Sequence, residues 1–78
     1  MKFELGRCLL KERLLEYGKS EEWLAKELLF KPERITDFIE NKRVMPLKIA
    51  ISIADSISCD VRTLYELIPN EDEVKFGD

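Results

Sequence analysis

Apolar residues recur at helical spacing along several short stretches of the chain, separated by polar breaks. In the first of these stretches leucine and tyrosine line one face of an amphipathic helix. The residues on that face are Leu5, Leu9, Leu10, Leu14 and Tyr17. Gly18 follows directly and is suited to end a helix, because glycine adopts the left-handed cap conformation without strain. The pattern predicts a first helix over residues 5–17.

Two further helices are predicted before residue 41. Ser20 can cap a helix over residues 21–28, where acidic residues in the first turn are favoured by the helix dipole. Pro32 suits the first position of a third helix that ends near Glu40. The apolar faces of these two helices comprise Leu24, Ala25, Leu28, Ile35, Phe38 and Ile39. The break between the helices is short, which is typical of a helix-turn-helix.

The second half of the chain predicts two more helices after a loop in which Asn41 is suited to a left-handed conformation. The fourth begins at Pro46, and its apolar positions are Leu47, Ala50, Ile51, Ala54 and Ile57. The β-branched residues of this segment would also suit a strand, but alanines four positions apart favour close helix packing. Asp60 can cap a fifth helix that Pro69 ends. The apolar face of that helix comprises Val61, Leu64, Tyr65 and Ile68. We therefore predict an all-α fold, a compact five-helix domain built around a helix-turn-helix.

Length and charge divide the chain into a body and a tail. Its 78 residues suit one domain with a small core, which we place at residues 1–68. Residues 69–78 carry four of the 16 acidic and one of the 13 basic side chains, and we expect them to be an acidic, flexible C-terminal tail. The body is then neutral, although the whole chain has a net charge of −3. Its one locally basic region is positions 31–48, where five basic residues stand against three acidic ones.

The sequence argues against several classes of function. It has no histidine for acid-base catalysis and no phosphate-binding glycine loop, so we do not expect an enzyme. Its two cysteines, Cys8 and Cys59, lie far apart without neighbouring ligands, so we expect no metal and no cofactor. Five helices in 78 residues leave little room beyond the core, so we expect no small-molecule ligand. We find no leader peptide and no apolar run long enough to cross a membrane, which predicts a cytoplasmic protein.

An ordered set of short motifs carries a resemblance to a known family. The set consists of Ser20 before the second helix, the pair Leu24 and Ala25, the pair Ile35 and Thr36, Lys42 and Arg43, and the closing segment "IADSISCDVRTLYEL". Residues 18–67 thereby resemble, without a gap, the lambda-repressor-like helix-turn-helix domains of the Cro/Xre family of phage and bacterial regulators. The opening segment resembles a branch common in Gram-positive bacteria and their prophages.

The resemblance implies a DNA-binding surface. In the family the third helix enters the major groove and the loop after it contacts phosphates. The residues that this places at DNA are Ser20, Glu21, Lys31, Glu33, Arg34, Asp37, Asn41, Lys42 and Arg43. Lys31 and Arg34 would supply charge near the groove, and the loop residues would hold phosphates. Glu33 and Asp37 would lie near base edges, where a carboxylate can accept from the cytosine amino group.

Three positions differ from the family pattern, and they leave two functions open. Glu21 replaces a common glutamine, Leu29 stands where the turn usually has glycine, and Asp37 replaces a polar or basic residue. The first hypothesis is a sequence-specific, repressor-like transcriptional regulator that binds a double-stranded DNA operator, as a homodimer if the resemblance extends that far. The alternative is a protein-interaction module, such as an antirepressor, whose partner is another protein and whose DNA face has turned acidic.

Overall fold

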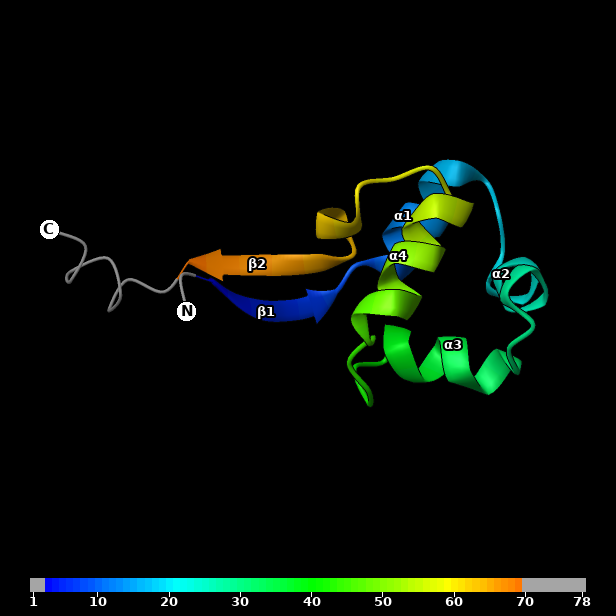
Figure 1. Cartoon of the computed structure of the whole chain (residues 1–78), viewed down its shortest axis with the longest axis horizontal. Helices are drawn as coiled ribbons and strands as arrows, with labels where there is room; N and C mark the ends of the chain where they lie inside the picture. Colours follow the sequence, from blue (N-terminus) through cyan, green and yellow to red (C-terminus); the bar gives the residue numbers. More distant parts are fainter. Residues whose placement is uncertain (1–2, 70–78) are drawn as a thin grey trace, which may run out of the picture.

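A computed structural model describes residues 3–69 as a helical body from which a two-stranded antiparallel ribbon projects (Figure 1). Along the chain the ribbon strand β1 comes first, the helices follow, and β2 returns beside β1. The bounds are β1 Phe3–Cys8, α1 Leu10–Tyr17, α2 Glu21–Leu28, α3 Pro32–Ile39, α4 Leu47–Ser56, the 3-10 helix η1 Val61–Thr63 and β2 Tyr65–Pro69. Among residues 3–69, none of the helices is long and apolar enough to cross a membrane.

The core lies where the four α-helices meet the inner end of the ribbon. Its largest fully buried side chains come from every α-helix and from the residue before β2; they are Leu10, Leu24, Ile35, Phe38, Ile53 and Leu64. Most of the predicted core positions are buried or half-buried, but five are exposed and therefore wrong: Leu5, Tyr17, Leu47, Ile51 and Ile68. Leu47 and Ile51 are exposed, and Ile53 is buried in their place. The buried stripe of α4 is therefore Ala50, Ile53, Ala54 and Ile57, the spacing of a single helix face.

The first predicted helix begins too early. Residues Phe3–Cys8 form β1, and α1 begins only at Leu10. The expected ending at Gly18 is confirmed, since Gly18 adopts a left-handed conformation and its N–H donates to the carbonyls of Leu14 and Leu15. Leu5 and Leu9 are spaced as on a helix, but a strand whose alternate residues face one side satisfies the same short pattern.

The fifth predicted helix is wrong, and with it the all-α, five-helix fold class. Asp60 does cap a helix, since its carboxylate accepts from the N–H of Arg62 at 2.9 Å, but the helix is a single 3-10 turn. Residues Tyr65–Pro69 instead form β2 and pair with β1, as in Leu5 with Leu67. Residues 3–69 thus form four α-helices and a two-stranded sheet. The apolar spacing of residues 61–68 suits a helix, but pairing with a strand about 60 residues away decides the outcome.

The predicted boundary between body and tail falls at the end of β2. Pro69 is the last residue of that strand and pairs with Phe3. The remainder of the predicted acidic tail, residues 70–78, lies outside the described residues.

Candidate nucleic-acid interface

Helices α2 and α3 form the predicted helix-turn-helix. The hydroxyl of Ser20 accepts from the N–H of Trp23 at 3.0 Å, which confirms the predicted cap of α2. Pro32 occupies the first turn of α3, as predicted. Between the helices Leu29 adopts a left-handed conformation with φ of 57°, so the turn keeps its shape with a leucine in place of glycine. The side chain of Leu29 is 93% exposed and contributes little packing in return.

The strained turn gives a first prediction. Replacing Leu29 by glycine should raise the free energy of unfolding by about 1 kcal/mol, because glycine adopts positive φ without the steric cost that an L side chain has there. Urea unfolding followed by circular dichroism would measure the change. Leu15→Gly, at an exposed position inside α1, is the control and should destabilise by about 1 kcal/mol. Equal destabilisation by both substitutions would contradict the strain at Leu29.

The outward side of α3 mixes acidic and basic groups. Ile35 and Phe38 face the core, while Glu33 and Arg34 are exposed and Asp37 is half-buried. The guanidinium of Arg34 lies over the ring of Phe30, with its central carbon 4.3 Å from the ring centroid. This cation-π contact holds the stem of Arg34 beside the turn and leaves its charge at the surface.

Both cations of the loop after α3 are paired with acidic residues from the end of that helix. The Nε atom of Arg43 lies 3.6 Å from Oδ2 of Asp37, and Nζ of Lys42 lies 3.2 Å from Oε1 of Glu40. Surface pairs of this kind contribute at most about 1 kcal/mol, because water and salt screen them. Lys42 and Arg43 can therefore exchange these partners for phosphates, but each exchange leaves a carboxylate behind.

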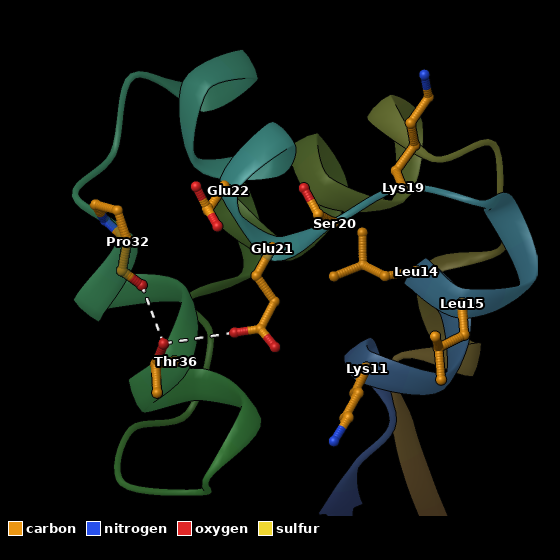
Figure 2. A pocket seen from close by; sticks show the side chains of 9 residues that line it. All are labelled: Lys11, Leu14, Leu15, Lys19, Ser20, Glu21, Glu22, Pro32 and Thr36. Carbon is orange, nitrogen blue, oxygen red and sulfur yellow. Dashed lines mark hydrogen bonds between the residues drawn. The ribbon is translucent and has the colours of Figure 1, made fainter.

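Glu21 is the first residue of α2, and its side chain points toward α3 (Figure 2). Its Oε1 atom accepts from the hydroxyl of Thr36 at 3.5 Å, and the same hydroxyl lies 3.2 Å from the carbonyl of Pro32 (Figure 2). A hydroxyl has one hydrogen to donate, so the two acceptors compete for it. Glu21 is thus directed at α3 and links the first turn of α2 to the middle of α3.

A groove of about 480 Å³ runs between α1 and the first turns of α2 and α3 (Figure 2). Two lysines border it, Lys11 from α1 and Lys19 from the residue before the cap of α2. The ammonium of Lys19 lies 5.3 Å from the ring centroid of Trp23, which itself packs against Tyr17 and the core. The sequence interpretation omitted both lysines, although the position of Lys19 directly before Ser20 was a usable signal for a cation near a helix N-terminus.

Asn41 adopts the predicted left-handed conformation, with φ of 62°, and joins the α3–α4 loop to the ribbon. Its Oδ1 atom accepts from the backbone N–H of Cys8 in β1 at 2.9 Å. Burial raises the pKa of the Cys8 thiol, so this neighbour remains neutral. The side-chain oxygen of Asn41 is thus engaged within the protein, and its NH2 group, 3.5 Å from the carbonyl of Ile39, keeps at most one N–H for a phosphate.

The structure brings most of the predicted site residues together in two groups. A depression of about 420 Å³ on the outer side of α3 is lined by Leu29, Phe30, Lys31, Glu33, Arg34, Asp37 and Arg43. Ser20 and Glu21 lie apart from it, in the groove between α1 and the first turns of α2 and α3. Within residues 3–69 no three His, Cys, Asp or Glu side chains are arranged to hold a metal ion.

The chain matches no established family model and no curated protein. Its fold is similar to the crystal structure of a proposed DNA-binding protein from Bacteroides fragilis, with a TM-score of 0.73. The likeness covers 77% of this chain and 97% of that chain, at 23% sequence identity. At this level of identity the likeness establishes the fold, which is a helix-turn-helix body with a two-stranded ribbon.

Proposed function

We propose that the protein is a sequence-specific DNA-binding regulator of the Cro/Xre type that places α3 in the major groove. The observation that carries the proposal is the α2–α3 unit, where a capped helix and an exposed helix meet at a tight turn. The fold likeness to a proposed DNA-binding protein supports it. Of the predicted cations, Lys31, Arg34 and Arg43 gather in one depression on the outer side of α3, and Lys42 lies beside Arg43 in the loop.

The chemistry of the side chains assigns the loop cations of this surface to phosphates and the acidic residues of α3 to base edges. Lys42 and Arg43 are at the end of α3, where a docked helix brings the following loop to the phosphate backbone. Glu33 and Asp37 are one turn apart on α3 and can meet base edges, where a carboxylate accepts from cytosine. Glu21 opposes phosphates at the first turn of α2, so this interface relies on few favourable charge contacts.

A salt series tests the proposal. Binding of the full chain to the DNA flanking its own gene would be measured by fluorescence anisotropy, with a shuffled duplex of the same length as control. With four cations at phosphates, the slope of log K against log salt should be about −4. Absence of binding at about 50 mM salt, or equal binding to the shuffled duplex throughout, would contradict a sequence-specific regulator.

A protein-interaction module is the second candidate, and the ion pairs of the loop favour it. Because Asp37 and Glu40 offset the charges of Arg43 and Lys42, the surface offers a patchwork of both signs. Such a patchwork suits a protein partner of mixed charge better than a polyanion. This candidate takes precedence if the salt series detects no DNA binding.

Asp37 gives a prediction that bears on both candidates. Asp37→Asn should raise the affinity for all DNA sequences, because it removes a carboxylate that opposes the approaching phosphates, and it should change the salt slope by less than about 1, since Arg43 contacts a phosphate in either case. The control is Asp55→Asn, which removes the same charge from an exposed position on α4. A loss of preference at one base pair, by about 1 to 3 kcal/mol, would show instead that Asp37 reads a base.

A further inference from the structure

Different partners hold the two halves of the loop between α3 and α4, residues 40–46. The first half is fixed to the end of α3, because the N–H groups of Lys42 and Arg43 both donate to the carbonyl of Asp37, at 2.9 and 3.3 Å. Together with the left-handed Asn41, these bonds close the last turn of the helix. The backbone of Lys42 is therefore positioned by α3 itself.

The second half of the loop is fixed by the ribbon. The N–H of Met45 donates to the hydroxyl of Tyr65, the first residue of β2, at 3.1 Å. Because Met45 is only 6% exposed, water is a poor substitute for this acceptor. The N–H of Val44 has no protein partner among residues 3–69, and Pro46 has no N–H. The bond to Tyr65 is therefore the hydrogen bond that fixes the backbone between Arg43 and α4. Burial raises the pKa of the Tyr65 hydroxyl, so the acceptor stays a neutral phenol.

The segment that Tyr65 holds brings two arginines together. A hollow of about 270 Å³ is lined by Arg34, Phe38, Arg43, Val44 and Pro46. Two guanidinium groups around one hollow suit phosphate oxygens if their spacing is fixed before binding. Arg34 is already held by its contact with the ring of Phe30. The ion pair of Arg43 with Asp37 is largely exposed and contributes little, so the place of Arg43 depends on the loop backbone.

We infer that Tyr65 is a positioning residue of the DNA interface, whose hydroxyl holds Arg43 in place through the backbone of Met45. This inference rests on the proposed function, in which Arg43 contacts a phosphate. A loop that is ordered in the free protein binds at a smaller entropic cost, because DNA does not have to immobilise its backbone. The ring of Tyr65 packs against the core, and its hydroxyl is the group that reaches the loop.

The inference gives the ribbon a role in an interface that its outer part does not reach. In Figure 1 the ribbon extends away from α2 and α3, and only its inner end lies beside the helical body. At that inner end Asn41 accepts from the N–H of Cys8, and Tyr65 accepts from the N–H of Met45. The first of these bonds acts on the residue that caps α3, and the second acts on the segment after Arg43. The two bonds therefore have separable effects on the loop.

Backbone relaxation of the free, nitrogen-15-labelled chain tests the positioning without DNA. In Tyr65→Phe, which keeps the ring and removes the hydroxyl, the order parameters of residues 43–45 should fall from about 0.85 toward about 0.6, while that of Lys42 stays high. Ile53→Val is the control, because it lowers stability by trimming a fully buried side chain of α4. It should leave these order parameters unchanged. Unchanged order parameters at residues 43–45 in Tyr65→Phe would overturn the inference.

A double-mutant cycle tests whether Tyr65 acts on DNA binding through Arg43. Tyr65→Phe alone should weaken binding to the flanking DNA by about fivefold, the cost of ordering about one backbone residue, and change the salt slope by less than about 0.5. Added to Arg43→Ala it should weaken binding by less than about twofold further, whereas added to Lys42→Ala it should keep its full effect.

Several results would contradict the inference. Equal losses of affinity in the Arg43→Ala and Lys42→Ala backgrounds would show that Tyr65 only stabilises the fold, and an equal loss in Ile53→Val would show the same. Circular dichroism would verify that each variant is folded. An ester in place of the amide of Met45, made by chemical synthesis, removes the donor and should reproduce the effects of Tyr65→Phe. If the unaltered chain binds no DNA, the proposed function fails, and the order parameters alone decide whether Tyr65 positions the loop.

Discussion

Replacing Lys42 and Arg43 together by alanine should weaken binding to every DNA sequence alike and reduce the salt slope by about 2. Both cations are in the loop after α3, and a lost phosphate contact carries no sequence information. The effect should exceed that of two ordinary surface cations, because the double change also leaves the carboxylates of Asp37 and Glu40 without their partners. Those two charges would then oppose the approaching phosphates.

The control for this double change removes two cations elsewhere on the surface. Lys26 on α2 and Arg62 on η1 are both exposed, and neither belongs to the predicted interface. Lys26→Ala with Arg62→Ala gives the same change in net charge and should alter the salt slope by less than about 0.5. If the control and the Lys42 and Arg43 variant lose affinity equally, the loop makes no special contribution. DNA binding that is unaffected by the loss of Lys42 and Arg43 would contradict the proposed docking.

Asn41→Ala should lower the free energy of unfolding by about 2 to 4 kcal/mol, the largest effect on stability that we expect. One part is the hydrogen bond to the N–H of Cys8, which the substitution leaves without its partner. The other part is backbone strain, because alanine tolerates the left-handed conformation of this position less well than asparagine. For a domain of this size the total stability is about 4 to 12 kcal/mol. The ribbon should detach first, since this bond joins β1 to the loop.

Two further substitutions at Asn41 separate the contributions. Asn41→Gly loses the hydrogen bond but relieves the strain, so it should cost about 1 to 2 kcal/mol. Asn41→Asp keeps an acceptor oxygen and should cost less than about 1 kcal/mol. Urea midpoints at constant m-value would measure all three. If Asn41→Asp lowers the free energy of unfolding as much as Asn41→Ala does, the hydrogen bond to the N–H of Cys8 contributes nothing to stability.

The helix-turn-helix could be predicted because its signals are local. Ser20 caps α2, Pro32 begins α3, and Ile35 and Phe38 are buried as their spacing indicates. Each of these features depends on residues within one or two turns. The left-handed conformation of Asn41 was likewise readable from its residue type and its place after a helix.

The ribbon could not be predicted because strand pairing joins the two ends of the chain. Residues 61–68 carry an apolar spacing that suits a helix, and only β1 makes the strand the better choice. The predicted first helix began too early for the same reason, because residues 3–8 form a strand only by pairing with β2. The fold therefore differs from prediction at β1 and β2, two strands far apart in the sequence that need each other for their hydrogen bonds, a known weakness of local patterns.

The residue types of the candidate site were predictable, but the ion pairs and hydrogen bonds between these residues were not. The sequence gives the residue types of α3 and the loop, and most of the site residues do gather around that helix. However, Arg43 reaches back six positions to Asp37, which requires the loop to reverse direction after Asn41. The contact between Glu21 and Thr36 similarly depends on how α2 crosses α3. Such contacts follow from tertiary geometry, so they were absent from the prediction.

Mapping the DNA contact by amide chemical shifts tests the central claim most directly. The labelled chain would be titrated with the DNA that flanks its gene at about 50 mM salt. The proposal predicts the largest shifts at the start of α2, along Glu33–Glu40 and at Lys42 and Arg43, with small shifts in the outer ribbon. Specific binding with its largest shifts on the ribbon and none on α3, or no shifts at all, would contradict the proposal that α3 reads DNA.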